Sequence, residues 1–248
     1  MRKKLLTGVA LALVLSAGMA QAAPSAAVTA AVADKGRPEA DTKRDADRKP
    51  AAMLEFAGVK PGDTVVDFIP GGGYFTRIFA KTVGPKGHVY AMGNPPPPNA
   101  TAPPPIAAVA ADPQYGNITI VSIAGGDFKL DKPADIFWTA QNFHDLYARQ
   151  RNIDVPKVVK AIYDNLKPGG VFVVLDHQGA PGAPIDPDDK LHRIDGAAVR
   201  KQVEAAGFKF EAESNVLRNP ADDHTKMVFD PSIRGHTDQF IYKFRKPR

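Results

Sequence analysis

The sequence predicts a doubly wound α/β fold, a mostly parallel seven-stranded sheet with helices on both faces and an antiparallel closing strand. Two observations carry this prediction. Strand-like apolar segments alternate with segments of helical periodicity along the chain, as in successive βαβ units. Several strands are continuous apolar and β-branched runs, which is typical of strands that are buried on both faces. The 248 residues can hold one such domain with extensions.

The N-terminal residues predict a secretory signal peptide. Three basic residues at positions 2–4 precede an apolar run over 5–19, and Ala20-Gln21-Ala22 is an A-x-A cleavage site. The apolar run is too short for a typical membrane span. We therefore expect residues 1–22 to be removed, and the mature protein to be periplasmic or secreted without stable membrane insertion.

Charge and cysteine content narrow the classes of partner. Residues 1–22 contain three basic and no acidic residues, so their removal lowers the formal net charge from +5 to +2. A nearly neutral protein gives no reason to expect a nucleic-acid partner, and we expect a small-molecule substrate instead. The chain has no cysteine, which excludes a disulfide framework and a thiolate metal site.

The remaining chain divides into a short linker and one domain. Residues 23–36 are rich in alanine without strand-like alternation, which predicts a flexible, disordered or weakly helical tether before a domain over 37–248. We expect helices over 50–56, 74–82, 106–111, 155–166 and 196–206. We expect strands over 64–68, 88–92, 118–123, 134–139, 171–176, 208–217 and 239–246.

The most informative segment begins as an apolar strand at Thr64, passes through Asp67 and enters Gly71-Gly72-Gly73. The glycines allow a sharp turn and let a ligand approach the backbone closely. Apolar residues at helical spacing follow from Tyr74. This order of strand, glycine turn and helix is typical of a nucleotide-binding turn. A tight turn without a ligand is the alternative, which three glycines after a strand-end acid disfavour.

This segment resembles motif I of the class I S-adenosylmethionine-dependent methyltransferases, D-x-G-x-G-x-G. Asp67, Gly71 and Gly73 are in register with the motif, whereas Ile69 stands at its first glycine. The helix-to-strand junction over 166–170 resembles the one before that family's fifth strand. The resemblance covers about residues 40–246 and implies a Rossmann-like methyltransferase fold, similar to the exported branch of predicted methyltransferases.

The resemblance also implies a site for S-adenosylmethionine. Asp67 would hold the methionine amine, while Asp127 would bind the adenine amine and Phe128 would stack on the ring. Gly93-Asn94 stand where the family has an acid for the ribose, and Asn94 could act as a neutral substitute. The implied cofactor-binding residues are Asp67, Gly71, Gly72, Gly73, Tyr74, Asp127, Phe128 and Asn142.

Candidate catalytic residues follow two predicted strands. His144 and Asp145 come after the fourth strand, and the imidazole titrates near neutrality, so this pair is predicted to be catalytic with His144 as a general base. A helix cap is the alternative role. Asp176-His177 end the fifth strand at the same carboxyl edge, where such sheets bind ligands, and are the second candidate.

Three other segments have less specific patterns. His192-Arg193-Ile194-Asp195 is expected to fix a loop or a helix start. Asp222-Asp223-His224 offers metal-ligand types, but it lies in a polar loop, so we expect no metal. The proline-rich residues 95–105 are expected to form a stiff loop, either a surface excursion or a lid over the ribose edge.

These observations favour a methyltransferase that uses S-adenosylmethionine and acts on an unidentified acceptor. The alternative is a non-catalytic exported small-ligand-binding protein on the same fold. Export favours this alternative, because the cofactor is made in the cytosol. Ile69 and the missing ribose acid also favour that alternative. A dinucleotide oxidoreductase is disfavoured, because Thr76 stands at the third glycine position and the expected downstream acid is missing.

Overall fold

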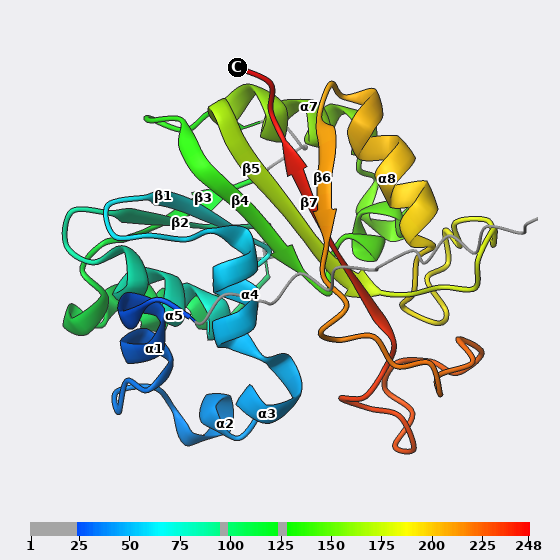
Figure 1. Cartoon of the computed structure of the whole chain (residues 1–248), viewed down its shortest axis with the longest axis horizontal. Helices are drawn as coiled ribbons and strands as arrows, with labels where there is room; N and C mark the ends of the chain where they lie inside the picture. The colour runs from blue at the N-terminus through cyan, green and yellow to red at the C-terminus, as the bar shows by residue number, and fades with distance from the viewer. Residues whose placement is uncertain (1–23, 95–98, 124–127) are drawn as a thin grey trace, which may run out of the picture.

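Figure 1 shows a computed structural model of the chain, which describes residues 24–94, 99–123 and 128–248. The predicted signal peptide over 1–22 and the predicted adenine ligand Asp127 lie outside these residues. Among the described helices, none is long and apolar enough to cross a lipid bilayer.

The described residues form a seven-stranded sheet with the spatial order β3-β2-β1-β4-β5-β7-β6. Strand β7 runs antiparallel to both of its neighbours, and the other adjacent strands are parallel. The predicted doubly wound sheet with an antiparallel closing strand is therefore confirmed. The strands are β1 (Thr64–Phe68), β2 (His88–Gly93), β3 (Ile118–Ser122), β4 (Ala134–Ala140), β5 (Leu166–His177), β6 (Lys209–Glu213) and β7 (Gln239–Arg245).

The strand order reverses between β1 and β4, because the chain leaves β3 at one edge and returns to the other side of β1. Open α/β sheets bind ligands at such a reversal, in the crevice beyond the carboxyl ends of the strands. This topology places the glycine turn after β1 beside the segment that follows β4.

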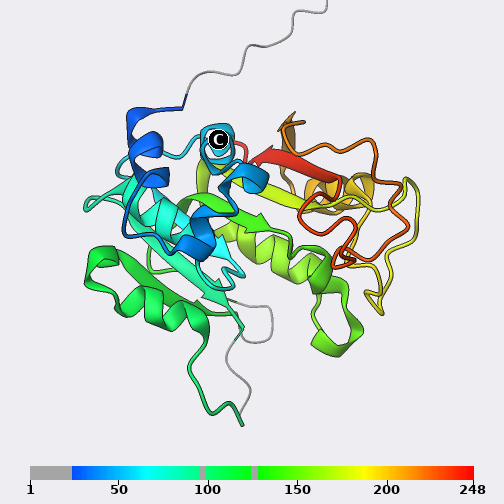
Figure 2. The same cartoon turned by 90° about the horizontal axis from the view of Figure 1, so that it is seen from below.

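Helices cover both faces of the sheet, as Figure 2 shows from below. Two hydrophobic clusters correspond to the two faces, with Val65 of β1 in one and Val66 in the other. Alternate residues of a strand point to opposite faces, which explains why β1 is apolar throughout. One face carries α1 (Ala26–Val32), α4 (Pro50–Ala57), α5 (Tyr74–Val83) and α6 (Pro105–Ala111), and the other carries α7 (Val155–Asn165) and α8 (Gly196–Ala205).

The structure corrects the predicted flexible tether over 23–36. Helix α1 lies within it and packs against α4 and α5. Val28 is fully buried and Ala31 nearly so, and these residues, three apart, share one face of the helix. A seven-residue helix is marginal by itself, so it is tertiary packing that stabilises α1, and the composition of the segment did not reveal that packing.

Candidate functional site

The turn after β1 keeps the backbone geometry of a glycine at Ile69. Its φ is 60°, in the left-handed region that β-branched residues rarely occupy. The carbonyl of Ile69 accepts a hydrogen bond of 3.0 Å from Nδ2 of Asn142, which follows β4. At the position of the motif's first glycine, Ile69 therefore has a backbone conformation that glycine adopts readily.

The three glycines have different surroundings. No described atom lies within 4 Å of a β-carbon built on Gly71 or Gly72, and both residues line a cavity at this edge of the sheet. Gly73 starts α5 with φ of 83°, and a β-carbon there would lie 3.0 Å from side-chain atoms of Ile106 and Val109 in α6. Gly71 and Gly72 thus face open space, whereas Gly73 allows two helices to pack.

Asp67 is a buried carboxyl at the floor of this turn. Oγ1 of Thr76 in α5 donates a hydrogen bond of 2.6 Å to Oδ2 of Asp67. Burial raises the pKa of Asp67 to about 6, against the opposing effects of the Thr76 hydrogen bond and the charge of Arg48. Near neutral pH the site therefore holds a carboxylate that has little compensation within the protein.

Five of the predicted cofactor residues line one cavity of about 210 Å³. They are Asp67, Gly71, Gly72, Tyr74 and Asn142. Phe128 does not line it and packs in the core, with its ring centroid 6.5 Å from that of Phe68 and 6.0 Å from that of Phe137. Gly73 is also absent from the lining, so the structure gathers part of the predicted set.

Two short N-terminal helices, α2 (Glu39–Thr42) and α3 (Asp45–Arg48), border the same cavity. Arg77 of α5 forms an ion pair of 2.8 Å with Asp41, and Oη of Tyr74 donates a hydrogen bond of 2.5 Å to Asp45. These bonds hold the charged segment over the glycine turn. The sequence analysis did not include this segment in the site, because charge runs are usually solvated surface.

Arg48 is the most unusual side chain of this segment. Its guanidinium lies 4.4 Å from the ring centroid of Tyr74 and 4.7 Å from that of Phe75. In the described parts of the chain it makes no hydrogen bond or ion pair, and its Nε is buried without a partner. Burial, assisted by the charge of Arg44, lowers the pKa of Arg48 to about 10, so the guanidinium stays charged at neutral pH. An anionic ligand would supply the missing partner.

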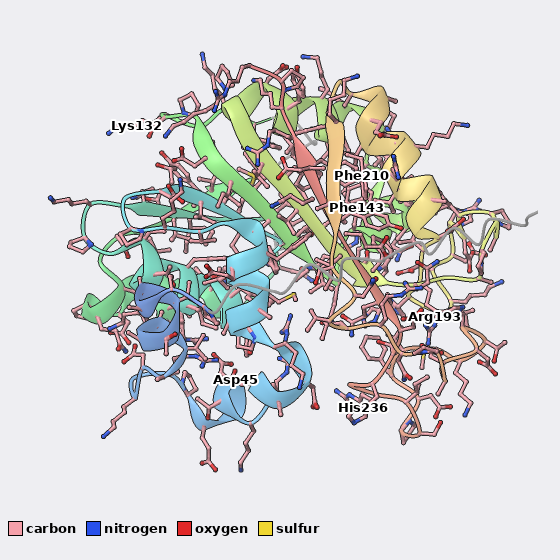
Figure 3. All side chains as sticks on the ribbon, viewed as in Figure 1. Asp45, Lys132, Phe143, Arg193, Phe210 and His236 are labelled. Carbon is pink, nitrogen blue, oxygen red and sulfur yellow. The ribbon has the colours of Figure 1, made fainter. Side chains whose placement is uncertain are left out.

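A second cavity of about 430 Å³ adjoins the first, and the two share Arg44, Arg48 and Gln141. Its other walls come from β5, β7 and the loop between β6 and β7. Figure 3 shows Asp45 of the N-terminal helices and His236 of that loop on the same side of the sheet. The remaining lining residues are Asp47, Leu175, His177, Leu217, Val228, Phe229, Arg234, Gly235 and Gln239.

The predicted base His144 lines neither cavity. Its Nδ1 lies 2.8 Å from Oδ1 of Asp176, and its backbone N–H donates a hydrogen bond to the other oxygen of that carboxylate. Burial lowers the pKa of His144, but Asp176 outweighs burial and the pKa rises to about 9. The structure therefore brings the two candidate pairs, His144-Asp145 and Asp176-His177, into contact. His144 itself lies behind the wall of the larger cavity.

His177, from the second candidate pair, lines the larger cavity. Its Nδ1 lies 2.7 Å from Oγ1 of Thr237, and Nε2 makes no hydrogen bond to the described residues. Burial lowers the pKa of His177 to about 4; the negative charge of Asp176 opposes this effect, and the charge of His144 adds to it. The imidazole is thus neutral near pH 7, with one ring nitrogen available.

Solved structures share this architecture. An S-adenosylmethionine-dependent methyltransferase from Aquifex aeolicus has a TM-score of 0.55 and 17% identity, over 86% of this chain and 100% of that chain. The 1,6-didemethyltoxoflavin-N1-methyltransferase of Burkholderia thailandensis, solved with S-adenosylhomocysteine, has a TM-score of 0.58 and 17% identity, over 85% and 82%.

The fold is that of S-adenosylmethionine-dependent methyltransferases. The cyclase SpnF also shares it, with a TM-score of 0.59 and 16% identity, over 87% of this chain and 85% of that chain. No protein-family model and no curated protein sequence matches the chain. Because one fold can carry different reactions, the methyltransferase fold leaves the reaction to be argued from the site.

The other polar segments lie outside the glycine turn and form structural contacts that fix loops and a helix start. Arg193 forms a buried ion pair of 2.9 Å with Asp222, and Nε2 of His224 lies 3.0 Å from Asp238. Asp195 caps α8 by accepting a hydrogen bond from the N–H of Ala197. The expectation that residues 192–195 fix a loop and a helix start is confirmed.

Proposed function

We propose that the protein is an exported methyltransferase that binds S-adenosylmethionine in the smaller cavity and a small acidic acceptor in the larger one. One observation carries this proposal: the two cavities adjoin and share Arg44, Arg48 and Gln141. Ligands bound side by side in this way can react with an entropic advantage, and methyl transfer depends mainly on such alignment. The methyltransferases among the structural neighbours support the same reaction.

The side chains around the smaller cavity fit this cofactor. The Asp67 carboxylate complements the amine of its methionine part, and the unpaired Arg48 guanidinium complements the carboxylate. Gly71 and Gly72 leave room against the backbone. S-adenosylmethionine supplies an electrophilic methyl group when bound. The chain's own contribution is to fix the charged ends of the ligand and to leave its reactive side toward the larger cavity.

His177 is suited to take a proton from the acceptor. A hydroxyl oxygen or amine nitrogen of the acceptor, distinct from its carboxylate, forms the bond to the methyl carbon as the carbon–sulfur bond breaks, and the proton on that oxygen or nitrogen must then leave. Nε2 of His177 is unprotonated when Nδ1 carries the ring proton toward Thr237, and it faces no described hydrogen-bond partner. We assign this role to His177 rather than to His144, because His177 lines the cavity and is neutral near pH 7.

The larger cavity favours an acidic acceptor with an apolar body. Arg44 and Arg234 line it without ion pairs to described residues, in addition to Arg48, whereas Asp47 is its one acidic lining residue among those described. If Arg48 binds the cofactor, the positive charges of Arg44 and Arg234 still outnumber the negative charge of Asp47 in this cavity. Leu175, Leu217, Val228 and Phe229 supply apolar walls. Carboxylates match this combination of cationic and apolar surface.

A non-catalytic ligand-binding protein is the second candidate. Asn94, exposed after β2, replaces the acid that the family uses for the ribose, which reduces the charge available for the cofactor.

We also propose that export follows removal of residues 1–22, which keeps the protein away from cytosolic S-adenosylmethionine. Mass spectrometry of the native protein tests export: an N-terminus at Ala23 is expected, and an intact Met1 in the cytosolic fraction would contradict it.

Calorimetric titration separates the candidates for function. Purified protein should bind S-adenosylmethionine and S-adenosylhomocysteine with one site per chain, and NAD should give no saturable heat. A screen for methyl transfer to small carboxylates, phenols and amines should then find activity first among carboxylates that also carry a hydroxyl or amine group. Cofactor binding without transfer to any acceptor would favour the non-catalytic candidate, and binding of NAD alone would overturn both.

A further inference from the structure

Four side chains with metal-binding atoms gather behind the larger cavity. His144 and Asp145 follow β4, and Asp189 and His192 belong to the loop between β5 and α8. One nitrogen or carboxylate oxygen from each residue lies within 4.8 Å of the corresponding atoms of the other three. Two imidazoles and two carboxylates form a ligand set that suits zinc and similar divalent transition ions.

His144 is oriented as a metal-binding histidine is. Oδ1 of Asp176 lies 2.8 Å from Nδ1, and this carboxylate also fixes the backbone N–H of the same residue. Nε2 makes no hydrogen bond to the described residues, and the carboxylate of Asp145 lies 3.7 Å from it. The side chain is only 5% exposed. Metal-ligating histidines typically have such a carboxylate on their second nitrogen, because it fixes the tautomer and the ring orientation.

The cluster is also rich in carboxylates. Asp145, Asp176 and Asp189 surround His144, and Asp176 and Asp189 are buried. Arg151 lies 3.2 Å from Asp145, but this guanidinium is at the outer side of the cluster, with its side chain 31% exposed. Nδ1 of His192 lies 3.0 Å from Oδ2 of Asp189. Buried carboxylates at this density are stabilised by a bound cation.

We propose that these four residues bind one divalent transition-metal ion, with Zn²⁺ as the best match, and that the ion joins the loop before α8 to the end of β4. Donor atoms around tetrahedral zinc lie about 3.3 Å apart, for bonds of about 2.0 Å, so the cluster would contract by rotation of side chains on the loop. Such a site does not depend on methyl transfer.

The position of the site gives the ion a structural role. The His144 ring centroid lies 6.1 Å from that of His177, and the His192 ring centroid lies 5.0 Å from that of Phe229. His177 and Phe229 both line the larger cavity. A metal ion that fixes His144 and His192 therefore fixes one wall of the proposed acceptor cavity, and its loss would loosen that wall while the glycine turn stays intact.

Metal titration of the full chain, without an affinity tag and after chelator treatment, tests the proposal. Zn²⁺ should bind with one equivalent per chain and a Kd below about 1 µM, and it should raise the thermal unfolding midpoint. Mg²⁺, which prefers oxygen ligands, should give no saturable binding. His192→Ala and Asp189→Asn should each weaken Zn²⁺ binding by at least about 100-fold, since each removes a proposed ligand.

His236→Ala is the matched control. His236 is exposed on the loop before β7 and does not belong to the cluster, so its substitution should leave Zn²⁺ affinity unchanged. Circular dichroism checks that each variant folds. If Asp189→Asn does not fold, His192→Ala decides the matter, because the His192 side chain is 31% exposed. No saturable Zn²⁺ binding, unchanged affinity in folded His192→Ala, or an equal loss in His236→Ala would overturn the proposal.

Discussion

The two cavities at the carboxyl edge of the sheet are built in different ways. The floor of the smaller one is a single strand, turn and helix, where Asp67, Gly71 and Gly72 lie within six residues of one another. The larger one combines the N-terminal helix α3 with β5, β7 and the loop between β6 and β7. The first depends on the local path of the backbone, and the second on contacts between distant loops.

This difference separates what each cavity needs in order to form. Parallel strand pairing and the packing of α5 hold the floor of the smaller cavity, so this floor should persist whenever the sheet is folded. The larger cavity needs the loops after β5 and β6 to be held together, and Arg193 holds them: it bonds to Asp222 and to the carbonyls of Gln178 and Lys226. Substitutions can therefore affect one cavity without the other.

The largest expected effect on stability is that of Arg193→Met. This change leaves the buried Asp222 carboxylate without its ion-pair partner, which should cost about 3–5 kcal/mol in the free energy of unfolding. Urea unfolding measures the loss. Arg193→Lys keeps the charge and should lose less. Where the variant is folded, S-adenosylhomocysteine should still bind, and a loss of that binding would show that the two cavities are not independent.

A smaller effect is expected for Asp67→Asn, and it should depend on pH. The pKa of Asp67 is raised to about 6 in the folded protein, so its proton stabilises the fold below the unfolded-state pKa and that stability is lost as pH rises through about 6. Asparagine does not titrate. The stability of Asp67→Asn relative to wild type should therefore increase by about 2 kcal/mol between pH 4.5 and 7.5.

Urea unfolding of both proteins at the two pH values measures this change. Asp131→Asn is a control on the same chain, because Asp131 is exposed and lies outside the cavity. A relative stability of Asp67→Asn that is the same at both pH values would contradict the assignment of a buried carboxyl with a raised pKa to the floor of the turn.

The fold was predictable because its signals are local. Apolar strands, glycine turns and helical periodicity locate each element within a few residues, and β1 was predicted with its observed bounds. The strand β5 was predicted too short. It begins at Leu166, which pairs with Ala134 of β4, and regular pairing resumes at Val171 after a register shift across the Pro-Gly-Gly segment. Helix α1 was missed, because a short alanine-rich helix is stabilised by packing rather than by its sequence.

The candidate site was predictable only in part, because only some of its residues lie close together along the chain. The glycine turn is contiguous, so Asp67 and Gly72 could be found from their order along the chain. Arg48, His177 and Arg234 meet only in the folded chain, and no periodicity connects them. The sequence also could not distinguish Gly72 from Gly73, because the difference lies in whether α6 occupies the space beside them.

Titration of S-adenosylhomocysteine into wild type, Gly72→Val and Gly73→Ala tests the central claim most directly. A β-carbon at Gly72 meets no described atom within 4 Å and projects into the proposed cofactor cavity, so Gly72→Val should fold normally and lose at least about 100-fold in affinity. Gly73→Ala should lose stability, since its β-carbon crowds Ile106 and Val109. Wild-type affinity in a folded Gly72→Val protein would contradict the placement of the cofactor at this turn.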